Sequence, residues 1–285
     1  MAFEITKLKC TKSPLVQLEK EVAVELGVIL SQNQFNIVYN VLSFGIAAML
    51  AGFIGFILLR DQLKAKHRAA LTLGTLVMAI ADYHYFRIFE SWVSAYHIKG
   101  GHYVATGIPF NEAYRYVDWL LTVPLLLAEL IAVLELGKER SKGLIGKLIV
   151  ASSLMIATGY PGQIAGLHST SRTVWAAISS VFFFYILYVL VVEINKVMKS
   201  ETEEVKKLMF TTRALLIMSW GFYPIAYILP SLFSGATVIV VTQVGYTVAD
   251  VIAKPLWTYF IFKISKAKQD DEELSVVSEK TLKVA

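Results

Sequence analysis

The sequence has little charge and almost no cysteine. Only 17% of its 285 residues are charged and 56% are hydrophobic, whereas soluble domains contain about 25% charged and about 45–50% apolar residues. Its one cysteine, Cys10, excludes an intrachain disulfide and a metal site built from thiolates. We expect no secretory signal peptide, because the apolar run at 22–30 is short and interrupted by charge. These scarcities indicate a membrane protein.

The hydrophobic residues are gathered into long blocks of about 20 residues or more, the length that crosses a bilayer as a helix. The predicted spans are 36–59, 69–95, 112–136, 144–164, 172–197, 208–231 and 239–263. The sequence therefore predicts an all-α membrane protein, a bundle of seven transmembrane helices in a lipid bilayer. The net charge of +5 does not indicate nucleic acid, because the basic residues flank apolar blocks instead of lining one face.

Lysine and arginine are distributed unequally between the predicted loops. Loops 60–68, 137–147 and 196–207 each hold four of these residues, whereas 165–171 and 232–238 hold none. Because cytoplasmic loops are enriched in Lys and Arg, we expect the N-terminus outside and the C-terminus in the cytoplasm of a multi-pass plasma-membrane protein.

Three regions follow from this topology. Residues 1–33 form an extracellular arm, 34–265 form the helical domain, and 266–285 form a polar cytoplasmic tail that we expect to be disordered. Between the second and third spans, the segment HIKGGHYVATGIPF is long enough for a small β-hairpin on the outer surface.

The third span carries charge inside an apolar stretch, YRYVDWLLTVPLLLAEL. At about 100° per residue, Arg115, Asp118, Thr122 and Glu129 share one face, with Asp118 and Glu129 about 16 Å apart along the axis. Glu129 has no cation near it in the sequence, so we expect it to be a neutral acid, since burial disfavours the charged form. A neutral acid on the same face as a charged one is what a proton relay needs.

The seventh span repeats the pattern, with Asp250 and Lys254 four residues apart on one face. A lysine in mid-bilayer costs about 2.5–3.5 kcal/mol, and such residues mark proton or ion pathways. A desolvated amine can also form a Schiff base with an aldehyde. The alternative is that Asp250–Lys254 or Arg115–Asp118 is a buried ion pair that only fixes helix packing.

At this point the sequence resembles a known family. The motifs RYVDWLLTVPLLLAEL, YHYFRIF, LMIATGYPG, ISSVFFFYILYVL, SWGFYPIAYILP and QVGYTVADVIAKP are similar to those of microbial (type 1) rhodopsins. The likeness is greatest to the xanthorhodopsin-like and proteorhodopsin-like outward proton pumps and covers about residues 34–265.

The resemblance implies the roles of the charged residues. All-trans retinal is bound to Lys254, Asp118 is the counterion and proton acceptor, and Asp250 is a second counterion with Arg115 just outside. Asp118, Thr122 and Glu129 form the proton-pump pattern, with Glu129 as donor. The resemblance also implies that His84 is paired with Asp118; the alternative is a packing histidine at a protomer contact.

The resemblance further implies a retinal pocket. Its residues are Tyr116, Trp119, Leu126, Met155, Gly159, Ser179, Phe183, Trp220, Tyr223, Pro224 and Tyr227. Leu126 occupies the colour-tuning position and suggests absorption of green light. Without the resemblance, most of these residues would be read as ordinary core, because aromatic and Met residues at helical spacing usually are.

The chain departs from the family pattern at several positions. Ala176, after Trp175, replaces the glycine of carotenoid-binding members and narrows the slot, so an antenna is the less favoured expectation. Asp82 stands where close relatives have a small residue, and we assign it no partner. The outer end of the seventh span has Thr242 and Gln243 and no acid. This predicts late proton release, or release through Glu90 or Glu112.

The predicted function is a light-driven outward proton pump that generates a proton-motive force, and not an enzyme. The expected partners are lipid, protons and further copies of the chain, in a trimer or pentamer; no metal is expected. Two alternatives remain. One is a photosensor with the same fold and no useful transport, and the other is a retinal-free proton-coupled transporter that uses Asp118, Glu129 and Lys254.

Overall fold

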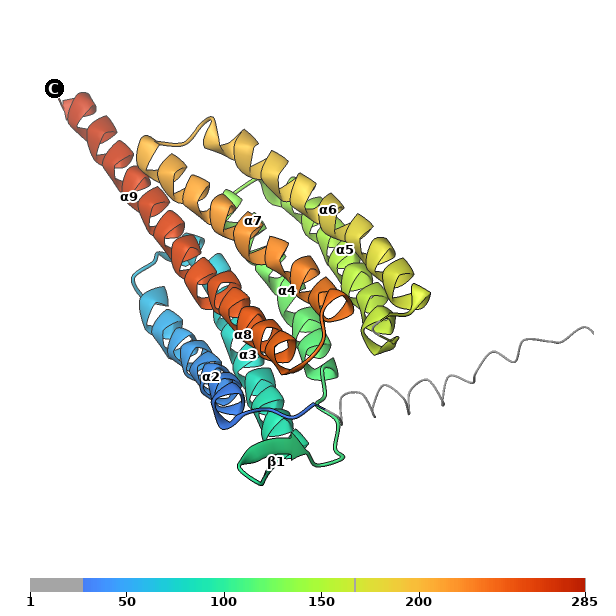
Figure 1. Ribbon diagram of the computed structural model, residues 1–285. Helices are drawn as coiled ribbons and strands as arrows, with labels where there is room; N and C mark the ends of the chain where they lie inside the picture. The colour runs from blue at the N-terminus through green and yellow to red at the C-terminus, as the bar shows by residue number, and fades with distance from the viewer. Residues whose placement is uncertain (1–27, 167, 285) are drawn as a thin grey trace, which may run out of the picture.

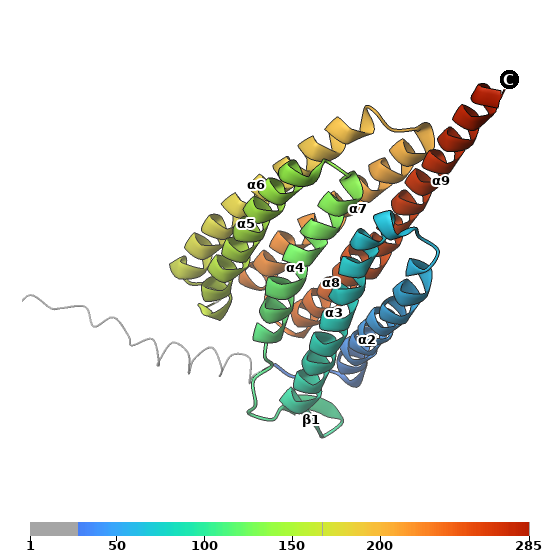
Figure 2. The same ribbon diagram turned by 180° about the vertical axis from the view of Figure 1, so that it is seen from behind.

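The fold is a helical bundle with a small hairpin at one end (Figure 1, and from behind in Figure 2). The structure is a computed structural model that describes residues 28–166 and 168–284. The helices are α2 (Gln32–Arg60), α3 (Arg68–Ala95), α4 (Ala113–Leu134), α5 (Lys138–Ile164), α6 (Thr170–Met198), α7 (Glu203–Leu232), α8 (Ala236–Val251) and α9 (Trp257–Val284), with the short elements η1 (Ala65–His67) and η2 (Ile252–Leu256). Because α8, η2 and α9 are continuous, the described residues form the seven rods that the sequence predicts.

The bundle is apolar outside and carries charge inside. Six helices of the described chain are long and apolar enough to cross a membrane; α3, which packs between α2 and α4, is not among them. Large apolar side chains such as Phe44, Phe184 and Tyr188 point outward and are more than half exposed, whereas Arg115 and Lys254 are 1% exposed. Water would favour the reverse arrangement, so this distribution is that of a protein whose surroundings are lipid.

The predicted hairpin is present and defines what we call the hairpin end of the bundle. Strands β1 (Tyr96–Lys99) and β2 (His102–Ala105) pair antiparallel, with Lys99 opposite His102. The turn residues Gly100 and Gly101 have φ of 59° and 81°, which a two-residue turn of this hand requires and glycine adopts without strain. Leu30 extends the sheet through an isolated bridge to Tyr103. Residues 1–27 of the predicted outer arm lie outside the described residues.

The seventh rod is widened where the lysine stands. Pro255 has no N–H to donate and its ring crowds the carbonyl one turn back. The helix accommodates Pro255 by forming a π-helical segment, η2, in which the Trp257 N–H donates a hydrogen bond to the Ile252 carbonyl. Such π segments are frequent at functional sites, and this one contains Lys254.

The prediction of a disordered tail is wrong for the described residues. α9 continues to Val284 and projects from the end of the bundle opposite the hairpin, which we call the tail end (Figure 1). The tail is polar, but its Lys, Glu and Leu residues favour helix. It is also tied to the loops: Lys64 pairs with Glu273 at 2.7 Å and Lys268 pairs with Glu201 at 2.7 Å. Tertiary contacts thus hold a segment that composition alone assigned to disorder.

Candidate functional site

The centre of the bundle holds one amine between two carboxylates. Lys254 Nζ lies 2.5 Å from Asp118 Oδ2 and 3.3 Å from Asp250 Oδ1, and all three side chains are at most 2% exposed. Asp118 comes from α4, and Asp250 and Lys254 come from adjacent turns of the seventh rod. Buried charges are tolerated only when they are paired and hydrogen-bonded, and here a single cation serves two acids.

The two carboxylates differ in their other partners. Tyr85 and Tyr223 donate hydroxyl hydrogen bonds to Asp250 at 2.7 and 2.6 Å. Asp118 Oδ1 has no hydrogen-bond partner among the described residues, and Thr122 donates to the Asp118 backbone carbonyl, not to its carboxylate. Asp250 is therefore fixed by three groups, whereas Asp118 depends on Lys254 and keeps one oxygen free to receive a proton.

Arg115 does not pair with Asp118. Its guanidinium donates to Gln243 Oε1 at 2.6 Å and lies 3.3 Å from Glu112 Oε2, while Gln243 in turn donates to Glu112 at 2.6 Å. Arg115 also lies over the Tyr246 ring, 5.1 Å from its centre. Of the two predicted release candidates, Glu112 thus joins Arg115, whereas Glu90 lies on the surface beside Arg87.

Glu129 occupies a separate pocket on the tail-end side of Asp118. It is completely buried, and neither carboxylate oxygen has a hydrogen-bond or ion-pair partner among the described residues. Its neighbours are Gly74 on α3 and Thr258 on α9. A Cβ atom added at Gly74 would come within 2.6 Å of Glu129 Oε1 and 2.8 Å of Thr258 Oγ1, so the missing side chain makes the room that Glu129 occupies.

A cavity lies between the helices, and Lys254 is part of its lining. Its lining is mainly aromatic and aliphatic and includes every residue predicted for the retinal pocket. Those residues are Tyr116, Trp119, Leu126, Met155, Gly159, Ser179, Phe183, Trp220, Tyr223, Pro224 and Tyr227. The cavity is also lined by Asp250. It suits a long apolar molecule whose one reactive end is an aldehyde that reaches the amine.

Tyr246 is one of the lining residues that were missed from the sequence. Tyr246 stacks on Tyr223 with ring centres 6.0 Å apart and contacts Trp119. Ala176 lines the cavity where its methyl group was expected to narrow a slot. Tyr85, which lies outside the cavity and holds Asp250, was also missed, because it had been read only as part of a motif.

His84 and Asp82 lie on α3 near this site. His84 is buried and within electrostatic range of Asp118, but among the described residues no hydrogen bond joins them, and His84 Nδ1 has no partner. Asp82 is half-buried and its Oδ1 has no partner in the described chain either. The structure thus brings Asp118, Asp250 and Lys254 into contact and leaves His84 as a near neighbour.

The sequence was compared with models of protein families. Residues 37–267 match the family of bacteriorhodopsin-like proteins. The chain is a microbial (type 1) rhodopsin. The family match and the apolar helices together show that it is a multi-pass protein of the cell membrane. The predicted resemblance to this family is confirmed.

Individual rhodopsins are similar over most of their length. The green-light absorbing proteorhodopsin of Gamma-proteobacterium EBAC31A08 is 29% identical over 219 residues, which are 77% of this chain and 82% of that protein. A crystal structure of thermophilic rhodopsin is 49% identical with a TM-score of 0.82, and that of xanthorhodopsin, titled a light-driven ion pump with dual chromophore, is 42% identical with a TM-score of 0.82. Both alignments cover 86% of this chain and 98% of the other.

Proposed function

We propose that this rhodopsin is a light-driven outward proton pump that uses retinal bound to Lys254. The observation that carries the proposal is that Lys254 lines a mainly apolar cavity and that its amine lies between Asp118 and Asp250. Its similarity to a green-light absorbing proteorhodopsin and to xanthorhodopsin, a light-driven ion pump, agrees with it.

The residues of the cavity fit retinal. Bound as an imine to Lys254 Nζ, retinal would supply absorption of visible light and a change of shape on illumination. Trp119 and Trp220 would contact its apolar chain, and Pro224 lies in the same wall. In the structure the free Lys254 amine stands for the imine nitrogen, so its contacts with Asp118 and Asp250 represent the contacts of the protonated imine.

Asp118 is assigned as the proton acceptor. It is the carboxylate nearest to the Lys254 nitrogen, at 2.5 Å, and has one oxygen without a partner. Asp250 is less suited to accept a proton, because two tyrosine hydroxyls already donate to it and favour its charged form. It acts as the permanent counterion, and His84 contributes electrostatically to Asp118.

Glu129 is assigned as the proton donor. A carboxyl group buried without a cation is stable there only as a neutral acid, which is the form that can give a proton to the Lys254 nitrogen. It lies about 16 Å from Asp118 along α4, on the opposite side of Lys254. The proton accepted by Asp118 leaves past Arg115 and Glu112, so each cycle moves one proton from the tail end to the hairpin end.

Outward transport follows if the hairpin end faces the exterior. The tail-end loops carry Lys and Arg, whereas 165–171 and 232–238 at the hairpin end have none, as the positive-inside rule requires. Retinal alone is the proposed chromophore, because Ala176 narrows the carotenoid slot. We also propose that the protein assembles as a trimer or pentamer.

A photosensor and a retinal-free transporter are the rival functions. Illumination of cells that express the protein with retinal should acidify the medium, and a protonophore should abolish the signal. A sensor would give no acidification at neutral pH. A retinal-free transporter would remain colourless, whereas the proposed pump has a visible band that hydroxylamine bleaches.

A further inference from the structure

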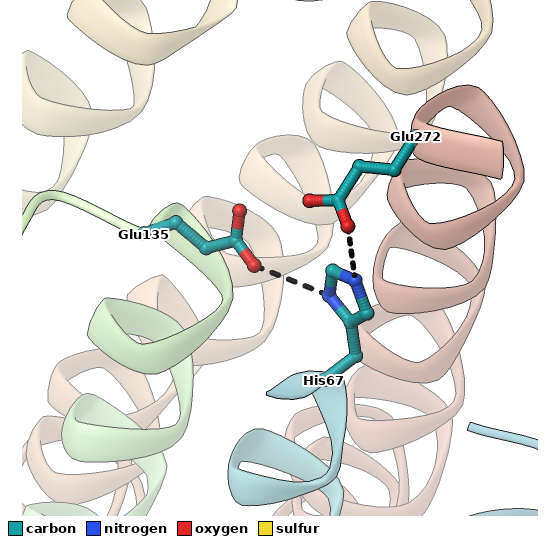
Figure 3. Close-up of side chains that lie close together, drawn as sticks. All are labelled: His67, Glu135 and Glu272. Carbon is teal, nitrogen blue, oxygen red and sulfur yellow. Dashed lines mark hydrogen bonds and ion pairs between the residues drawn. The ribbon is translucent and has the colours of Figure 1, made fainter. Parts of the chain in front are cut away.

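A second titratable cluster lies at the tail end and has no part in the function proposed above. His67 ends η1, Glu135 follows α4, and Glu272 lies on α9 (Figure 3). His67 Nδ1 lies 3.1 Å from Glu135 Oε1, and His67 Nε2 lies 3.3 Å from Glu272 Oε2. The His67 side chain is 2% exposed, whereas those of Glu135 and Glu272 are 32% and 45% exposed. A buried imidazole thus lies beneath two carboxylates that reach water.

The geometry of the cluster suits a proton better than a metal ion. The two carboxylates approach opposite nitrogens of the ring, as Figure 3 shows. A metal ion binds along the lone pair of one nitrogen and would leave the carboxylate at the other nitrogen out of reach. Proton transfer can use both nitrogens, because imidazole accepts a proton at one nitrogen and releases another from the second.

The local backbone and charges hold the cluster in place. Glu135 has φ of 52° and is the non-glycine residue in the described chain with positive φ, a strained conformation that usually persists at functional positions. Lys66 binds the other oxygen of Glu272. The hydrogen bond from Lys66 holds the pKa of Glu272 below its ordinary value, so this carboxylate is charged at neutral pH and faces the imidazole.

The cluster and Glu129 are framed by the same three helices, α3, α4 and α9. His67 and Gly74 are seven residues apart, which places them on one face about 10 Å apart along α3, and Gly74 is the residue that borders Glu129. Between the two levels the helices present buried apolar side chains, among them Leu71, Leu130 and Ile261. These side chains separate Glu129 from the tail-end surface.

We propose that the cluster of His67, Glu135 and Glu272 is the proton source from which Glu129 is recharged. The inference rests on the proposed pump function. One proton passes from water through Glu272 to His67 Nε2, and the proton on Nδ1 leaves past Glu135, through water admitted during the cycle, to the Glu129 carboxylate. The imidazole then regains its first tautomer by exchange with water. Each cycle therefore takes one proton from the tail-end solution and leaves the cluster in its starting charge state.

The main alternative is a clasp that only joins the three helix ends. The charged groups that face His67 are Glu135 from α4, Glu272 from α9 and, from its own segment, Lys66. A clasp and a relay both need these groups for stability. Only a relay makes the rate of proton uptake depend on the imidazole's ability to exchange protons.

The test is flash photolysis of the full-length protein with retinal in vesicles, with a pH dye that reports proton uptake. In His67→Gln, which keeps a hydrogen-bonding side chain but cannot shuttle, we expect Glu129 recharging to slow by about tenfold or more at pH 8. The absorption band and the proton transfer to Asp118 should not change. Imidazole added to His67→Gly should restore the rate, and Glu272→Gln should slow uptake in the same direction.

The matched control is Glu193→Gln, which removes two other ion pairs of the tail end. The buried Glu193 carboxylate on α6 pairs with Arg140 on α5 and with Lys196 one turn further along α6. Its uptake rate should equal that of the unmodified protein. Uptake at the normal rate in His67→Gln, or equal slowing in Glu193→Gln, would overturn this inference and leave the proposed pump function unaffected. If the unmodified protein moves no protons in light, the proposed function fails, and this inference fails with it.

Discussion

Two carboxylates on the same helix, Asp118 and Glu129, have opposite surroundings. Asp118 contacts a buried cation at 2.5 Å, whereas Glu129 has no ion-pair partner in the described chain and lies beside the neutral hydroxyl of Thr258. Both are buried and both lie on one face of α4. Because both side chains are buried carboxyl groups, they differ mainly in the neighbours that α3 and the seventh rod supply. One helix thereby holds the two carboxylates that we propose as proton acceptor and proton donor.

The largest expected effect comes from removing the cation. Lys254→Ala removes the group that retinal is proposed to join and leaves two buried aspartates without a cation, so we expect complete loss of the visible band and of light-driven acidification. Absorption spectra of membranes prepared with retinal measure the effect. Lys263→Ala, which changes an exposed lysine of α9, should retain both colour and pumping.

Asp118→Asn should have the next largest effect. The amide cannot take the proton from the Lys254 nitrogen, so proton transport should fall by at least about 100-fold. The absorption band should also shift, because the nearest negative charge to that nitrogen is lost. Asp82→Asn alters a carboxylate that does not line the cavity and should leave the band in place. Normal pumping by Asp118→Asn would show that the acceptor is another residue.

Glu129→Gln should slow one step and leave the colour nearly unchanged. Without the neutral acid, the Lys254 nitrogen must regain its proton from water, so late recovery should slow by about 100-fold at neutral pH. Because the proton now comes from solution, recovery should slow a further tenfold or so for each unit that pH rises. Flash photolysis across a pH series records this, and recovery that is fast and independent of pH would contradict the donor assignment.

The smallest predicted effect concerns the space around Glu129. In Gly74→Ala the new methyl group meets Glu129 and Thr258, so we expect destabilisation of about 1–3 kcal/mol and several-fold slower recovery. The temperature at which colour is lost measures the first effect. Gly55→Ala is the control, because nothing lies within 4 Å of its added Cβ, and it should be neutral or slightly stabilising.

Much of the architecture was predictable because it depends on local patterns. Apolar blocks of bilayer length predicted seven rods, and the Gly100–Gly101 pair marked the hairpin turn. The helical tail was not predicted. Its polar composition indicated disorder, and only contacts such as Lys64–Glu273 and Lys268–Glu201 reveal what holds it.

Composition and helical spacing were enough to predict the fold class, the number of rods and which residues are too polar for a bilayer. Only the tertiary structure decided how those residues pair. Asp118 and Lys254 are separated by 136 positions, and Arg115 turns to Glu112 and Gln243 instead of Asp118. Spacing relates residues within one helix, whereas contacts between helices, such as Asp118–Lys254 at 2.5 Å and Arg115–Gln243 at 2.6 Å, depend on how the rods pack.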